Sequence, residues 1–173
     1  EMPANGSTIF KDGQITLVGD VNSSTQIFTM TTDQLKLHPI SVNLDQTTTQ
    51  ANAIIINVKA PNAVEDFCLP FKIETDVQTS GVGLSPYAHM IIFNIDPQIK
   101  NIHLANTSYL QGSLLAPETN VIAGDAGSSI NGQLIAKSFD GQGTTFECHW
   151  IPWEGSIKEP VVPQCPELTI IKN

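Results

Sequence analysis

The chain has 173 residues, which corresponds to one ordinary domain with enough material for a hydrophobic core. Its formal net charge is −9, and every cation is a lysine because the sequence contains no arginine. This composition argues against a nucleic-acid partner, since phosphate recognition relies on a clustered basic face and usually on arginine.

Short strands separated by turns are expected along the whole chain, because Ile, Val and Thr recur and long helical patterns are missing. We expect strands at residues 9–10, 14–18, 26–30, 40–44, 53–58, 71–75, 90–95, 102–105, 109–115, 121–123, 129–136 and 144–151. One short helix is expected at 32–37, where Thr31 or Thr32 could cap it. The longest apolar run is 53–56, far short of the roughly twenty residues of a membrane span, so no membrane insertion is expected.

Two pairs of segments repeat. Residues 110–117 (LQGSLLAP) align with 130–137 (INGQLIAK) at a spacing of 20, and 54–59 (IIINVK) with 91–96 (IIFNID) at a spacing of 37. Repeats near 20 residues favour an all-β fold of the right-handed β-helix (β-solenoid) type, with at most a short helix. Gly112 and Gly132 would lie at corners of the coils, where positive φ is needed. Two similar hairpins of a β-sandwich remain the alternative.

The three cysteines are too far apart for a zinc or redox motif, so no metal site is expected. An odd count permits one disulfide and one free thiol. Cys148–Cys165 is the first candidate disulfide and Cys68–Cys165 the second, while three reduced thiols remain an open alternative. A thioester at Cys68 is weakly supported, because no glutamine-centred motif accompanies it.

No catalytic constellation is recognised, and no cofactor is indicated. The histidines lack the i, i+4 spacing of a zinc-binding helix; they are His38, His89, His103 and His149. His149 should share a strand face with Glu147, and we expect this pair to close the last coil rather than catalyse. The aspartates that could serve a sugar-cleaving enzyme fall in turns; they are Asp96, Asp125 and Asp140.

Threonines and aromatic residues offer candidate surfaces without a defined site. Threonines that could order water on a flat face are Thr29, Thr31, Thr32, Thr47, Thr48 and Thr49, but they form no regular ladder. Conceivable sugar platforms are Tyr87, Tyr109, Trp150 and Trp153, of which the two tryptophans are expected to pack over the open end of the solenoid. The ligand-binding residues therefore remain unassigned at this point.

An ordered series of blocks resembles the bacterial choice-of-anchor A family, also described as an ice-binding-like adhesive domain of Gram-positive surface proteins. The matching blocks are 53–58 (AIIINV), 92–95 (IFNI), 111–117 (QGSLLAP), 130–138 (INGQLIAKS) and 147–155 (ECHWIPWEG). The resemblance implies a right-handed β-helix displayed at the cell surface, upstream of stalk domains and anchored to the cell wall through regions outside this chain.

From the resemblance we expect a non-catalytic adhesin domain that binds an extracellular protein or glycan receptor. We expect a monomer within a longer multidomain protein. The adhesive domain is expected to cover residues 1–157, and residues 158–173 to form a proline-rich linker and the start of a following stalk domain. The alternatives are a polysaccharide-active hydrolase or lyase on a β-helix, and an ice-binding domain.

Overall fold

The computed structural model describes residues 2–11, 14–37, 40–69, 71–73, 86–104, 109–123, 129–142 and 146–157. Within these ranges the protein is mainly β, with short helices only, as the composition predicts. The strands are β1 (Ser7–Lys11), β2 (Gln14–Val18), β3 (Thr25–Thr31), β4 (Ile40–Leu44), β5 (Ala53–Lys59), β6 (Val64–Leu69), β7 (Phe71–Ile73), β8 (Ile91–Ile95), β9 (Ile99–Leu104), β10 (Tyr109–Gln111), β11 (Ser113–Ala123), β12 (Ser129–Asn131), β13 (Leu134–Asp140) and β14 (Glu147–His149). The helices are α1 (Thr32–Leu37), α2 (Gln46–Thr49) and the single 3-10 turn η1 (Ala88–Met90).

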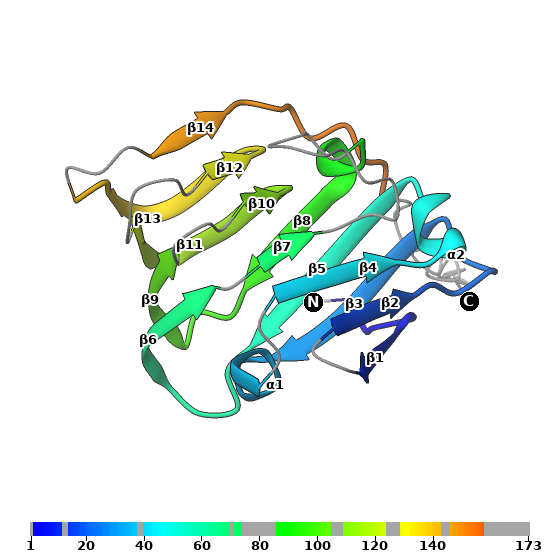
Figure 1. The fold of residues 1–173 in the computed structure, drawn as a ribbon, viewed down its shortest axis with the longest axis horizontal. Coiled ribbons are helices and arrows are strands. Elements are labelled where there is room, and N and C mark those ends of the chain that lie inside the picture. Colours follow the sequence, from blue (N-terminus) through cyan, green and yellow to red (C-terminus); the bar gives the residue numbers. More distant parts are fainter. Residues whose placement is uncertain are drawn as a thin grey trace, which may run out of the picture.

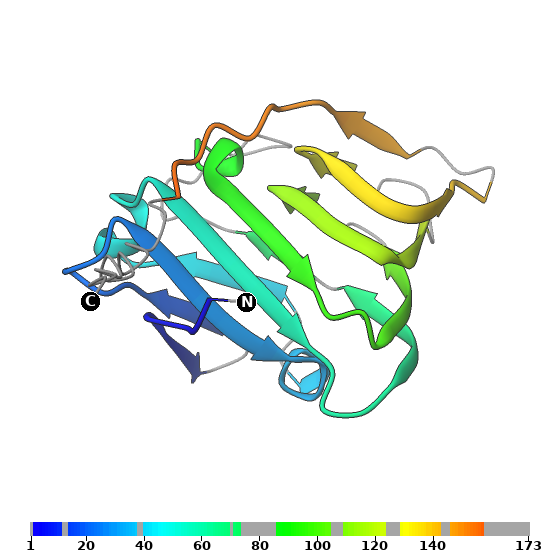
Figure 2. The same ribbon diagram turned by 180° about the vertical axis from the view of Figure 1, so that it is seen from behind.

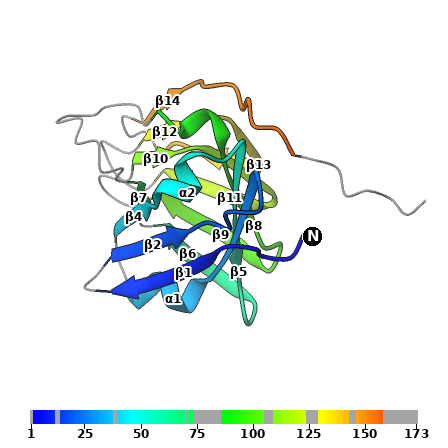
Figure 3. The ribbon, with the colours of Figure 1, turned by 90° about the vertical axis from the view of Figure 1, so that its right-hand side faces the viewer.

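The strands form two walls that face each other across the core (Figure 1). One wall contains a sheet in the order β1-β2-β4-β7 and a second in the order β10-β12-β14, with β10 next to β7. The other is a curled sheet in the order β3-β5-β8-β11-β9-β6, to which β13 is added beside β11. Figure 3 shows the two walls on opposite sides of the molecule. Together they make a curled, parallel half-barrel.

Both predicted repeats are confirmed as pairs of neighbouring parallel strands. The 20-residue repeat places Leu110 opposite Ile130 and Leu114 opposite Leu134. The 37-residue repeat pairs β5 with β8, with Ile54 opposite Ile91. A repeat of this kind aligns equal side chains one above another, so each inward position extends a continuous apolar row. The β-sandwich alternative is wrong, because β1 and β2 form the one antiparallel pair among the described strands.

The core row shows this stacking most clearly. Phe28, Ile56, Phe93 and Leu114 lie opposite one another on β3, β5, β8 and β11, and none is more than 1% exposed. Because side chains alternate between the two faces of a strand, the residues between these positions point outward. The same strands therefore build the core and an outer surface.

Gly112 and Gly132, the two glycines expected at corners, are required for different physical reasons. Gly112 lies between β10 and β11 with φ +139°, a conformation that favours glycine. At Gly132, between β12 and β13, the expectation of positive φ is wrong: among the described glycines Gly112 alone has it. Gly132 is required by close approach instead, because a Cβ there would lie 2.2 Å from the carbonyl oxygen of Gly112.

Most expected elements are present, and the predicted helix at 32–37 has the bounds of α1. The expectation missed β6, α2 and the full length of β11, which runs through Pro117 and Glu118. The expected strand at 109–115 is interrupted at Gly112, so that it contributes to both walls. The half-barrel confirms the predicted mainly β class, while the regular β-solenoid stays a prediction.

A segment after β14, residues 150–157 and here called the closing segment, crosses the ends of strands from both halves of the chain (Figure 2). The backbone amide of Glu154 donates to the carbonyl of His89 at 2.7 Å, and that of Ser156 to Asn52 at 3.1 Å. The amide of Trp153 donates to Oε1 of Gln133 at 3.3 Å. These bonds tie the closing segment to the residues just before β5 and β8 and to the link between β12 and β13. The Thr25 hydroxyl of β3 also donates to the carbonyl of Ser156, at 3.5 Å.

Asp45 caps α2 and joins it to β2. Its Oδ1 accepts hydrogen bonds from the Thr48 hydroxyl at 2.6 Å, the Thr48 amide at 2.7 Å and the Gly19 amide at 3.1 Å. Partial burial raises the pKa of Asp45, but the bonds from Thr48 and Gly19 outweigh it and hold the pKa below its usual value. The carboxylate therefore stabilises the fold in its charged form.

We expect Asp45→Ala to lower the free energy of unfolding by about 1 kcal/mol at neutral pH, the usual cost of a lost N-cap. Because the folded pKa is lower than the unfolded one, the charged form contributes fully above the unfolded value of about 4 and less as pH falls through the folded value. Urea unfolding at about pH 6 and about pH 3 should show the difference between the variant and wild type shrinking in acid. An equal difference at both pH values would contradict this account.

Candidate functional site

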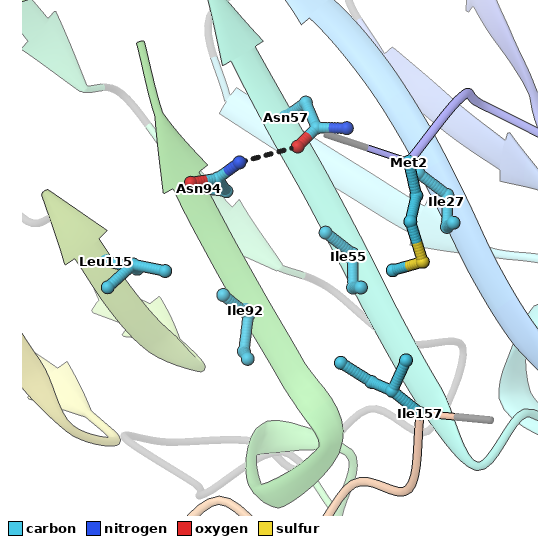
Figure 4. Close-up of a pocket in the computed structure, with 8 residues that line it drawn as sticks. All are labelled: Met2, Ile27, Ile55, Asn57, Ile92, Asn94, Leu115 and Ile157. Atoms are coloured by element: carbon cyan, nitrogen blue, oxygen red, sulfur yellow. Dashed lines mark hydrogen bonds between the residues drawn. The ribbon is translucent and has the colours of Figure 1, made fainter. Parts of the chain in front are cut away.

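The outer face of the curled sheet contains an open hollow of about 410 Å³ (Figure 4). The residues that line it come from β3, β5, β8, β11 and the two ends of the described chain: Met2, Ile27, Ile55, Asn57, Ile92, Asn94, Leu115 and Ile157. Ile27, Ile55 and Ile92 occupy equivalent register positions on three neighbouring strands, directly beside the core row. The hollow therefore follows from the same repeat that builds the core.

The two chain ends border the hollow. On the N-terminal side, Asn5 pairs with Ile27 much as a residue of an additional strand would. The backbone amide of Asn5 donates to the Ile27 carbonyl at 3.0 Å, and the side-chain Oδ1 of Asn5 accepts from the Ile27 backbone amide at 2.8 Å. On the C-terminal side, the closing segment holds Ile157, which follows Ser156 and its bond to Asn52. Ile27 and Ile55 are consequently only 5% and 8% exposed although they face outward.

An amide pair forms the polar border of this hollow. Nδ2 of Asn94 donates to Oδ1 of Asn57 at 2.8 Å, so each side chain fixes the orientation of the other (Figure 4). Asn57 is only 3% exposed, and Asn94 is half-buried. A side-chain amide has two donors and an acceptor, so the pair retains hydrogen-bonding capacity beyond its mutual bond. An apolar floor with a few oriented polar groups is the usual composition of a ligand site.

A second outward feature crosses β6, β9, β11 and β13. We call Asp66, Asn101, Asn120 and Ser138 the polar ladder, because they lie opposite one another in register. The Ser138 hydroxyl donates to Asn120 at 2.8 Å, Asn120 to Asn101 at 2.9 Å, and Asn101 to Asp66 at 3.2 Å. Every rung is therefore connected to the next across four strands.

His103 joins the end of the polar ladder. Its Nε2 lies 2.9 Å from Oδ1 of Asp66, and the two side chains are 33% and 65% exposed. The hydrogen bonds from His103 and Asn101 lower the pKa of Asp66 below its usual value. Asp66 thus remains a carboxylate over the whole neutral range and anchors the ladder as its acceptor.

The predicted contact between Glu147 and His149 is present, with Oε2 and Nε2 at 3.3 Å. The other ring nitrogen of His149 contacts Oδ1 of Asn131, which is fully buried. Both members of the pair are exposed on β14, at the last strand of its sheet. The arrangement supports the expected structural role at the end of the stack.

The aspartates considered for sugar cleavage do not converge in the described structure. Asp96 accepts a bond from the amide two residues later, at Gln98, and Asp140 does the same with Gln142. Both are turn residues, as predicted, while Asp125 and His38 lie outside the described residues. Among the residues described, no group of three or more His, Cys, Asp and Glu side chains is placed to hold a metal ion.

Other candidates are separated from one another. Trp150 is 71% exposed, so the expectation that it covers the end of the stack is wrong, whereas Trp153 is half-buried. Thr32 and Thr48 are fully buried, so the threonines do not share one flat face. Tyr87 is half-buried beside η1, and the side chain of Tyr109 is outside the described part.

Cys148 is exposed on β14 and Cys68 is exposed on β6. Cys165 lies outside the described residues, so the pairing of Cys148 with Cys165 stays a prediction.

Sequence reasoning missed the hollow and the polar ladder. A signal for Asn57 and Asn94 was present, because both hold the same position in the 37-residue repeat. Asn101 and Asn120 fall outside both repeats, and Met2 and Ile157 become neighbours of the hollow through tertiary structure alone. No local sequence pattern identifies such residues.

The described residues thus form a mainly β domain whose parallel scaffold has an apolar hollow and a connected polar ladder on its outer surface. Residues 1–148 match the family described as "Putative Ice-binding-like adhesive domain", and the chain belongs to this family. The resemblance of the sequence blocks is thereby confirmed, and it extends over the N-terminal half as well. No curated protein and no solved structure matches the chain.

Family membership makes this an adhesive, ice-binding-like domain whose ligand the family does not specify. An adhesive domain implies binding to something extracellular, and it suggests a surface location and a non-catalytic role. None of the described helices is both long enough and apolar enough to span a bilayer.

Proposed function

We propose that the protein is a non-catalytic adhesin domain of a bacterial surface protein and binds an extracellular protein or glycan. The observation that carries this proposal is the hollow on the outer face of the curled sheet, in a chain that belongs to an adhesive family. An aliphatic group of the ligand would contact Ile92 and Leu115, while Asn94, held in place by its bond to Asn57, would orient the polar part of the ligand.

The same strands build the core and the outer surface that carries the hollow and the polar ladder. In-register pairing of β8 with β11 and of β11 with β13 supports our proposal that the half-barrel belongs to a right-handed β-helix. We further propose that residues 1–157 form the adhesive domain and 158–173 a linker leading into a stalk domain. Attachment to the cell wall would be through regions outside this chain.

The proposed extracellular location also bears on whether the cysteines form a disulfide. An extracellular location would permit a Cys148–Cys165 disulfide, for which exposed Cys148 is accessible. Intact mass of the purified protein tests it, because each disulfide lowers the mass by about 2 Da relative to the reduced chain. An unchanged mass after reduction would exclude the bridge.

The adhesive function is tested by coating beads with the full chain and measuring capture of extracellular matrix proteins, glycans and whole cells. The variant Ile92→Trp fills the hollow from an outward-facing position, so the core row is not altered. We expect this variant to bind the captured ligand at least about tenfold more weakly, which corresponds to about 1.4 kcal/mol of binding free energy.

The matched control is Ile9→Trp, because Ile9 is 51% exposed on β1 in the opposite wall. It should bind as the wild type does. Equal binding by wild type and Ile92→Trp would remove the hollow from the proposal, and failure of the wild type to bind any ligand or cell would overturn the adhesive function.

A further inference from the structure

The polar ladder has a direction. Each hydrogen bond is donated toward Asp66: from Ser138 to Asn120, from Asn120 to Asn101, and from Asn101 to Asp66. A carboxylate has acceptors only, so it sets the orientation of the first amide and, through it, of the others. These side chains are fixed at the surface before any ligand arrives, which reduces the ordering cost of binding.

The spacing of the ladder suits a repeating ligand. Its rungs come from neighbouring strands, which lie about 4.8 Å apart, a repeat close to the length of one hexose unit in an extended chain. Amides, a hydroxyl and a carboxylate supply both donors and acceptors, and a sugar hydroxyl is itself both a donor and an acceptor.

The neighbouring outward row contributes one aliphatic side chain. Ile122 on β11 lies opposite His103 on β9, two residues beyond Asn120 and Asn101, and both are half-buried. Because side chains two apart share a strand face, this row runs beside the ladder on the same surface. A pyranose ring has hydroxyls at its edge and C–H groups on its faces, so it would contact both rows at once.

Charge distinguishes between classes of polysaccharide. Asp66 and Asp140 lie on the two outer strands of this surface, and the chain has a net charge of −9 without any arginine. An anionic glycan would be repelled, because like charges oppose association across an interface.

We propose that the polar ladder binds a neutral, extended β-linked polysaccharide. This inference rests on the proposed adhesive function and adds to the hollow a second contact surface with its own class of ligand. Contacts of this kind are individually weak, so binding would depend on several hexose units contacting successive rungs.

The test is affinity gel electrophoresis of the full chain in gels that contain hydroxyethylcellulose, galactomannan or dextran sulfate. We expect at least one of the two neutral polysaccharides to retard the protein and dextran sulfate to leave it unaffected. The variants Asn101→Leu and Asn120→Leu keep side-chain size but break the ladder, and each should weaken retardation at least tenfold.

One control separates the ladder from other effects. Asn43→Leu removes an amide that bonds Gln14 in the opposite wall, and this variant should be retarded as the wild type is. Ser138→Ala, at the exposed end of the ladder, provides a variant that is safe for folding and should show a partial loss.

Retardation by dextran sulfate alone, no retardation by either neutral polysaccharide, or equal retardation of wild type and both asparagine variants would overturn the proposal. If the neutral polysaccharides fail while beads coated with the chain still capture a protein ligand or cells, only the glycan assignment falls. If nothing is captured in either experiment, the adhesive function falls with it.

Discussion

Replacing Gly132 by alanine is expected to lower the free energy of unfolding by about 3 kcal/mol or more, at the upper end of the cost of overpacking. A Cβ at this position would lie 2.2 Å from the carbonyl oxygen of Gly112 and 2.4 Å from its carbonyl carbon. These are backbone atoms and cannot rotate away. Backbone hydrogen bonds also fix both glycines: the Gly112 amide donates to the carbonyl of Asn131, and the Gly132 amide donates to the carbonyl of His149.

Gly141→Ala is the matched control for this variant. Among the described residues, a Cβ at Gly141 would meet Cε1 of Phe139 at an ordinary contact distance of 3.8 Å. The cost should stay within about 0.5 kcal/mol, as for most surface substitutions. Urea unfolding of both variants measures the difference in stability. Equal stability of Gly132→Ala and Gly141→Ala would show that Gly132 is not packed against the backbone of Gly112 as closely as the structure has it.

The repeats made much of the fold predictable. Once 110–117 and 130–137 are aligned, parallel stacking fixes which residues share a row, and the structure has these partners. The helix α1 was predictable for a local reason, since Thr31 accepts the Gln34 amide at the start of its first turn. In both cases the signal lies in contiguous residues.

Other elements could not be predicted because their signal is weak or not local. Strand β6 (VEDFCL) lacks a regular alternation of apolar and polar residues, and Glu65 and Asp66 are poor strand formers, so its pairing with β9 decides the outcome. The hollow needs Met2 and Ile157 to meet across the sheet. The ladder needs four strands to pair in one register, a property of the assembled sheet rather than of any segment.

The hollow and the polar ladder have a common origin in β11. Its first half pairs with β8 and carries Leu115 at the hollow, and its second half pairs with β9 and carries Asn120 in the ladder. The register shifts between Ala116 and Asn120, where the strand turns from one surface to the other. Both surfaces therefore depend on one continuous core beneath them.

That core leads to the second large expected effect. Phe93→Ala should lower the free energy of unfolding by about 3–5 kcal/mol, the range for a phenylalanine deleted from a packed interior. Phe93 is fully buried at the centre of the core row, between Ile56 on β5 and Leu114 on β11. Strands β5 and β11 would close the cavity off on both sides, and they cannot approach each other without breaking the backbone bonds of β8.

Phe139→Ala is the matched control, because Phe139 is 44% exposed at the edge of the stack and packs mainly against Phe146, with ring centroids 5.0 Å apart. Its loss should cost about 1 kcal/mol, the value of one aromatic pair at a partly solvated site. Urea unfolding monitored by tryptophan fluorescence and circular dichroism compares the two variants. If both variants cost the same, the core row does not hold β3, β5, β8 and β11 together, and the hollow and the ladder on the outer side could not be as rigid as adhesion through them requires.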